Sequence, residues 1–169
     1  MMDAPIYLYT YPTAQSEQSL IQRLEAGKTV WTYILVPGLT KTTARLALDS
    51  LFITVCPNVI SDDLCETLRL RADTGQVLSD TPGQLWTAAP EYAVIVEMLS
   101  KTARAVDFFT FKAHLIDVMG ETAFSGAVNS RLNCGQFDVL GARPQSRGLA
   151  LTLRDGCGVW RKVFLTTSS

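Results

Sequence analysis

The segment LALTLRDGCGVWRKVFLT, residues 149–166, decides the fold prediction for this chain. Leucine stands at every second position from 149 to 153, which is typical of a strand with one buried face. The run Asp155-Gly156-Cys157-Gly158 has the composition of a tight turn, and residues 159–166 again have strand character. The segment therefore predicts a β-hairpin, and the rest of the sequence is interpreted around it.

Length and composition predict one folded domain over residues 1–169. Of the 169 residues, 47% are hydrophobic and 18% are charged, which is enough apolar material for a core. The formal net charge of −1 and the high apolar content exclude an intrinsically disordered chain. The longest apolar stretches, residues 30–35 and 92–99, are too short to cross a membrane as helices.

Outside the hairpin, four segments are rich in aromatic and β-branched residues and predict strands, although the last could also be a helix. These segments are residues 6–11, 30–36, 52–56 and 92–99. The composition of residues 75–90, with several Gly, Pro, Asp, Ser and Thr, predicts a long surface loop.

Four other segments combine an N-cap residue with apolar residues at helical spacing, and three of them end near a glycine. They predict helices at Ser16–Gly27, Thr40–Leu51, Ser61–Gly75 and Asp107–Gly120. The expected fold class is therefore α+β, with helices packed on a mixed, mostly antiparallel sheet that includes the C-terminal β-hairpin.

The cysteines and the first residues predict a reducing compartment. Residues 1–11 lack the charged and apolar regions of a secretory signal, so Cys56, Cys65, Cys134 and Cys157 are expected to be thiols. Their spacings contain no C-x-x-C pair, and the only histidine is His114, so no zinc site is expected.

No residue pattern predicts catalysis. His114 lies in a predicted helix without a recognisable nucleophile or orienting acid, and a structural role is expected for it. Cys157 lies between two glycines, where the turn explains it. The sequence also has no phosphate-binding glycine loop or hydrolase motif. We therefore expect no enzyme, no cofactor, no metal and no small-molecule substrate; a cleft joining His114 with a cysteine and an acid would favour an enzyme.

Charge is divided along the chain. Residues 57–100 carry two basic and seven acidic residues, whereas residues 101–169 carry nine basic and five acidic residues. The two parts could pair within one fold, or they could form oppositely charged faces suited to self-association and to an anionic partner. The candidate contacts to an anionic partner are Arg131, Arg143, Arg147, Arg154, Arg161 and Lys162. The candidate self-association residues are Asp62, Asp63, Glu66, Asp80 and Trp86.

The order of the expected elements resembles that of rhabdovirus matrix proteins, especially the short ones of plant-infecting members. The resemblance covers a strand at 6–11, a helix at 20–24, a strand at 31–36 and a helix at 43–51, and resumes in residues 148–160. It implies a non-enzymatic structural protein of the virion that self-associates and bridges the nucleocapsid to the membrane. The chain lacks a lysine-rich arm, so its C-terminal arginines would meet the anionic lipid.

The leading hypothesis is thus a viral matrix-like assembly protein in the virion and host cytoplasm, peripheral to the membrane. Its self-association is expected to weaken with salt, and it is not expected to bind nucleic acid with direct sequence specificity. The alternative is a small intracellular protein-binding protein, an accessory or inhibitor protein of phage or bacterial origin, located in the bacterial cytoplasm.

Overall fold

The computed structural model describes residues 4–10, 19–35, 39–57, 65–103, 106–131 and 137–167. These residues form fourteen β-strands, and no helix is found among them. The strands are β1 (Ile6–Thr10), β2 (Ser19–Glu25), β3 (Lys28–Leu35), β4 (Leu39–Ala47), β5 (Ser50–Pro57), β6 (Glu66–Arg71), β7 (Val77–Pro82), β8 (Gln84–Ala88), β9 (Tyr92–Ala103), β10 (Val106–Asp117), β11 (Gly120–Arg131), β12 (Phe137–Gln145), β13 (Gly148–Asp155) and β14 (Trp160–Thr167).

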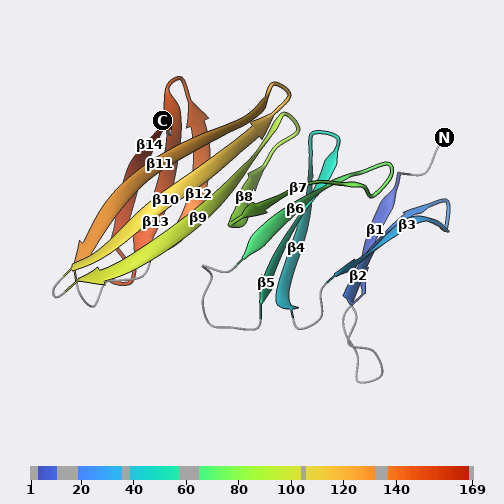
Figure 1. Cartoon of the computed structure of the whole chain (residues 1–169), viewed down its shortest axis with the longest axis horizontal. Coiled ribbons are helices and arrows are strands. Elements are labelled where there is room, and N and C mark those ends of the chain that lie inside the picture. The colour runs from blue at the N-terminus through green and yellow to red at the C-terminus, as the bar shows by residue number, and fades with distance from the viewer. Residues whose placement is uncertain are drawn as a thin grey trace.

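The strands form three antiparallel sheets that follow one another along the molecule (Figure 1). A three-stranded sheet contains β1, β2 and β3 in that order, and a four-stranded sheet contains β4 to β7 in that order. The remaining strands form a seven-stranded sheet with the order β12-β13-β14-β11-β10-β9-β8. The four-stranded sheet lies between the other two.

In the middle sheet the strand β5 is buried on both faces from Ser50 to Cys56, and it is apolar at almost every position. Leu51, Ile53 and Val55 share a core with the three-stranded sheet, including Ile21 and Trp31. On the opposite face, Phe52 packs against side chains of β9 and β10. This second core contains Ala47, Phe52, Ala93, Ile95 and Ile116.

The seven-stranded sheet curves until its two outer strands meet. The Thr87 hydroxyl of β8 donates a hydrogen bond to the Ala142 carbonyl of β12 over 3.0 Å. The third core fills the concave side of this sheet, because each strand turns every second residue inward. Its fully buried members include Val94, Phe111, Ala113, Leu149, Leu151, Leu153 and Leu165.

A buried hydroxyl network joins the middle sheet to β8. The Thr54 and Thr67 hydroxyls lie 2.9 Å apart, Thr67 Oγ1 donates to the Gly83 carbonyl over 2.9 Å, and the Leu85 amide donates to Thr54 Oγ1 over 3.0 Å. Gly83 has a φ of +115°, and a Cβ there would lie 2.6 Å from the Val96 carbonyl oxygen. A glycine is therefore required where the chain passes from β7 to β8.

The predicted hairpin is confirmed, since β13 and β14 pair antiparallel from Leu149–Leu165 to Arg154–Trp160. The strands predicted from residues 6, 30, 52 and 92 are also confirmed as β1, β3, β5 and β9. Tyr11 and Val36, at the ends of two of these predictions, lie outside the described residues.

The expected α+β class is wrong, because the described parts of all four predicted helices are strands. Residues 19–25 form β2, residues 39–47 form β4, residues 66–71 form β6 and residues 106–117 form β10. The β10 side chains that enter the core of the seven-stranded sheet are Phe109, Phe111 and Ala113, which is strand alternation rather than helical spacing. Pairing with neighbouring strands outweighed the local preference of these segments for helix. The resemblance to matrix proteins included helices at residues 20–24 and 43–51. Residues 20–24 lie in β2, and residues 43–51 contain the end of β4 and the start of β5.

The long surface loop predicted over residues 75–90 is also wrong. Residues 77–82 form β7 and residues 84–88 form β8, so the segment contains two strands joined at Gly83. The Gly and Pro residues that suggested a loop mark the turns at the ends of these strands. The described residues include no helix that is long and apolar enough to span a membrane.

The thiol prediction is corrected as well. Cys56, in β5, and Cys65, just before β6, form a disulfide that closes the connection between these neighbouring strands. Cys157 is also disulfide-bonded. The sequence could not reveal this pairing, because Cys56 and Cys65 are brought together by the antiparallel register of β5 and β6.

Candidate functional site

The outward side of β12, β13 and β14 combines exposed aromatic and basic side chains. In the register of these strands, Arg154 lies opposite Trp160, and Ala150 lies between Arg143 and Phe164. Trp160 is 67% exposed and Phe164 is 48% exposed. We call this surface the hairpin face, and its residues are Arg143, Arg154, Trp160, Lys162 and Phe164.

The turn before β14 sets the position of Trp160. The buried Asp155 carboxylate accepts hydrogen bonds from the Cys157 amide (3.0 Å) and the Val159 amide (2.9 Å). The bond from Val159 is the main cause that lowers the pKa of Asp155, with help from the Cys157 amide and from Arg161. The carboxylate therefore fixes the turn, and the alternation of β14 directs Trp160, Lys162 and Phe164 outward.

The structure brings together only part of the predicted basic set. Arg143, Arg154 and Lys162 share the hairpin face. Arg147 is exposed in the turn between β12 and β13. Arg161 points to the other side of β14, with its Nε 3.4 Å from an Asp155 carboxylate oxygen. The side chain of Arg131 lies outside the described part of the chain.

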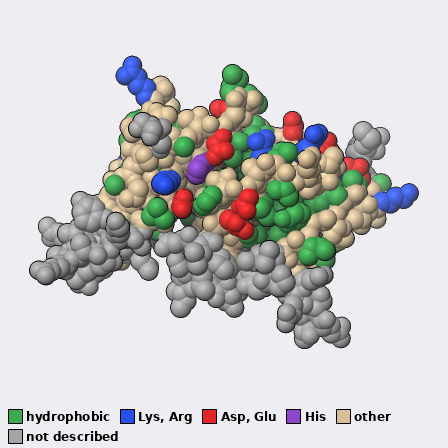
Figure 2. Space-filling view, viewed as in Figure 1, with side chains coloured by type: hydrophobic (Ala, Val, Ile, Leu, Met, Phe, Trp, Pro, Cys, Tyr) green, Lys and Arg blue, Asp and Glu red, His purple; other side chains and the backbone are tan. Residues whose placement is uncertain are grey.

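The structure does not bring the described members of the predicted self-association set, Glu66, Asp80 and Trp86, onto one surface. Asp62 and Asp63 lie outside the described residues. Trp86 is partly buried against the core of the seven-stranded sheet. On the face shown in Figure 2, charged side chains of both signs are spread among hydrophobic ones rather than separated by sign.

Glu66 and Asp80 form a close pair on the side of β6 and β7 that faces Tyr33 of β3. Burial is the main cause that raises the pKa of Glu66, followed by the charge of Asp80 and a side-chain hydrogen bond to it. Burial and these two carboxylates also raise the pKa of Tyr33. The pair is thus turned toward the neighbouring sheet, where two negative charges repel each other.

We expect Glu66→Gln to stabilise the protein at neutral pH by about 0.5 to 1 kcal/mol, the typical cost of opposed like charges on neighbouring strands. A raised folded-state pKa gives stability that is present at acidic pH and is lost as pH rises through that pKa. The variant should therefore show less loss of stability than the wild type between pH 4 and pH 7. Urea unfolding at several pH values measures this difference.

Glu97→Gln is the matched control, because Glu97 lies opposite Lys112 rather than beside another acid. It should give no stabilisation at neutral pH. Equal stability curves for Glu66→Gln and wild type across this pH range would contradict the repulsion between Glu66 and Asp80.

His114 lies on the outward side of β10, not on the predicted helix. Its Nδ1 lies 2.7 Å from an oxygen of Glu121, and its side chain is partly buried. This contact links two adjacent strands and suits a structural role for His114. Within the described ranges, no three His, Cys, Asp or Glu side chains are grouped so that they could hold a metal ion.

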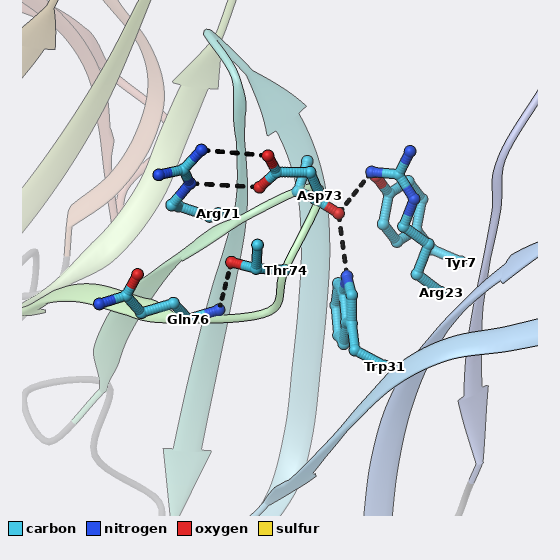
Figure 3. A network of polar contacts seen from close by, with 8 residues as sticks. Tyr7, Arg23, Trp31, Arg71, Asp73, Thr74 and Gln76 are labelled. Carbon is cyan, nitrogen blue, oxygen red and sulfur yellow. Dashed lines mark hydrogen bonds and ion pairs between the residues drawn. The ribbon is translucent and has the colours of Figure 1, made fainter.

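A second candidate site lies where the turn between β6 and β7 meets the three-stranded sheet (Figure 3). Trp31 Nε1 donates to the Ala72 carbonyl over 2.9 Å, and Arg23 donates to the same carbonyl. Gly75 has a φ of +76°, and a Cβ there would lie 2.7 Å from Trp31. The indole therefore packs directly on this turn because residue 75 is glycine.

The arginines around this turn are held by carboxylates. Arg23 lies 2.6 Å from Glu25, and its guanidinium lies 5.8 Å from the centre of the Tyr7 ring. Arg71 donates two hydrogen bonds, of 3.2 and 3.0 Å, to the Asp73 carboxylate, and these bonds lower the pKa of Asp73. Both guanidinium groups are therefore fixed in orientation.

These arginines border a hollow of about 620 Å³, which we call the arginine hollow. It is lined by Tyr7, Arg23, Leu46, Leu48, Asp49, Ser50, Arg69, Arg71, Ala72, Asp73 and Leu78. The sequence does not predict this hollow, because the cap at Ser61 and the spacing of the following leucines favour a helix up to Gly75. The alternation Thr67-Leu68-Arg69-Leu70-Arg71 was the available signal, since it places both arginines on one face of a strand.

Comparison with known protein families, curated protein sequences and solved structures finds no match to this chain.

Proposed function

We propose that this protein is a non-enzymatic structural and assembly protein that binds an anionic partner through the hairpin face. The observation that carries this proposal is the row Trp160, Lys162 and Phe164, which alternate outward along β14. A cation between two exposed aromatic rings gives both charge attraction and apolar contact. This combination suits an anionic surface with an apolar layer beneath it, such as a membrane of acidic lipids.

Self-association is supported by the outward side of the three-stranded sheet. Ile6 is 62% exposed and Ile34 is 56% exposed, and Leu8 and Val30 are also exposed. Ile6 and Leu8 alternate along β1 with Tyr7 and Tyr9, which pack inward. Such an apolar sheet face favours contact with another protein surface. The matrix-type role, in which the protein bridges a nucleocapsid and a membrane, is the narrower form of this proposal.

We expect the protein to sediment with vesicles that contain phosphatidylserine and to bind pure phosphatidylcholine vesicles much more weakly. Lys162→Glu should weaken binding to the acidic vesicles by at least about 5-fold, because each basic residue near such a surface contributes about 1 kcal/mol. Trp160→Ala should also weaken binding, with a smaller dependence on salt. Sedimentation at several salt concentrations measures both effects.

Lys28→Glu is the control, since Lys28 is an exposed lysine on β3 in the sheet at the other end of the molecule. The same change of charge there should alter binding by less than about 2-fold. Equal losses for Lys28→Glu and Lys162→Glu would show that net charge acts without a specific face. Equal binding to acidic and neutral vesicles would contradict the proposal.

The second candidate function is a partner-binding protein of an oxidising compartment. The Cys56–Cys65 disulfide favours it, because stable disulfides are rare in reducing compartments. This alternative keeps the non-enzymatic role and replaces the membrane with one protein partner. A stable complex with a single protein, together with no binding to acidic vesicles, would favour it.

A further inference from the structure

The arginine hollow combines charged and apolar side chains, as ligand sites do, and it lies outside the surfaces proposed for assembly. Its volume of about 620 Å³ is within the usual range for small-molecule sites. It is bordered by β1 and β2 of one sheet and by β4, β5, β6, β7 and two turns of the next. We propose that this hollow binds a small amphiphilic carboxylate, with the carboxylate on Arg69 and the apolar body on the leucine side chains.

Arg69 is the cation that would receive the carboxylate. Its guanidinium lies 5.6 Å from the centre of the Phe52 ring, and its Nε donates to the Ser50 hydroxyl over 2.8 Å. These contacts leave the two terminal nitrogens of the guanidinium group available to a ligand. Arg23 and Arg71 have carboxylate partners, whereas no described acid forms an ion pair with Arg69. Two terminal nitrogens match the two oxygens of one carboxylate.

The other polar residues of the hollow favour a single negative charge. Asp49 and Asp73 line the same space and would repel a dianion such as a phosphate monoester. Arg23 and Arg71 are already neutralised by Glu25 and Asp73. The hollow therefore offers one oriented cation rather than a field of high positive charge.

The apolar part of the ligand is indicated by three leucines. Leu46 and Leu78 are exposed large hydrophobic residues, and Leu48 lies at the turn between β4 and β5. All three line the hollow. An alkyl or aromatic body covering them would remove apolar surface from water, which adds to the attraction of the charged group.

A neighbouring hollow, of about 610 Å³, also contains Arg69 but has different chemistry. Asp49, Glu91 and Asp117 line it, so three carboxylates accompany one arginine. An anion is disfavoured there by like charge. Residues that line only one of the two hollows can show where a ligand binds. Ala72 and Asp73 line only the arginine hollow, and Met119 and Gly120 line only its neighbour.

The test is a titration of the isotopically labelled protein with octanoate, octanol and octyl phosphate, followed by NMR and calorimetry. Octanoate should bind and shift the amide signals of Ala72 and Asp73 more than those of Met119 and Gly120. Octanol should bind at least about 10-fold more weakly, because it lacks the charge-assisted bonds. Octyl phosphate should also bind more weakly. Equal affinities for octanoate and octanol, or shifts confined to Met119 and Gly120, would overturn the proposal.

Variants separate ligand binding from effects on folding. Arg69→Gln should weaken octanoate binding by about 10-fold and leave octanol binding unchanged. Arg45→Gln, at an exposed arginine of β4 outside the hollow, should leave both unchanged. Leu78→Ser keeps every arginine and should weaken octanoate and octanol equally. An unchanged affinity for octanoate in both Arg69→Gln and Leu78→Ser would overturn the proposal.

Discussion

Replacing Phe111 with alanine is expected to lower the free energy of unfolding by about 3 to 5 kcal/mol. Phe111 is 0% exposed and lies in the core enclosed by the seven-stranded sheet. It stands opposite Gly126 of β11 and Met98 of β9, in the middle of the sheet. The loss combines the transfer of the ring to water with the cavity that remains. Guanidinium unfolding followed by fluorescence measures it.

Val118→Ala is the control for this prediction, because Val118 lies at the exposed turn between β10 and β11 and is 83% exposed. Its change in stability should stay within about 0.5 kcal/mol. A Phe111→Ala variant as stable as the control would show that the ring is not enclosed as the structure describes.

The second large effect is expected from the disulfide that joins β5 to the start of β6. The double variant Cys56→Ser, Cys65→Ser should lose about 2 to 4 kcal/mol of stability, since the unfolded chain gains freedom when the link is removed. The cross-strand pairs of β5 and β6 remain in the variant, so it should fold to the same structure. Urea unfolding of the variant and the wild type under oxidising conditions gives the difference.

Reduction provides the control. A reductant should destabilise the wild type by at least as much as the double substitution, because Cys157 is also disulfide-bonded. Wild type and variant with equal unfolding midpoints under oxidising conditions would show that the Cys56–Cys65 link contributes nothing to stability.

Strands were predictable where the local sequence and the fold agree. The hairpin of β13 and β14 was recognisable because its leucines alternate and its turn residues are specific. The helix predictions failed where an alternative spacing was also present. Residues 107–118 have apolar side chains at helical spacing, yet Phe109, Phe111 and Ala113 also alternate, and pairing with β9 and β11 decides between the two patterns.

The candidate sites depend on contacts that a sequence shows only in part. The basic residues of the C-terminal region were identified, but the strand register was needed to separate Lys162, on the hairpin face, from Arg161 on the other side. The arginine hollow combines Arg23 of β2 with Arg69 and Arg71 of β6. Arg23 is distant in the chain from the two arginines of β6, and the packing of two sheets brings them together.

The strand β5 contributes to two cores at once, with Leu51, Ile53 and Val55 on one face and Phe52 on the other. Opening either interface exposes apolar surface of the same strand, so the two interfaces support each other. We therefore expect the sheets of this molecule to unfold as one cooperative unit rather than as separate subdomains. A ligand in the arginine hollow, which touches both smaller sheets, would act on that whole unit and raise its unfolding temperature.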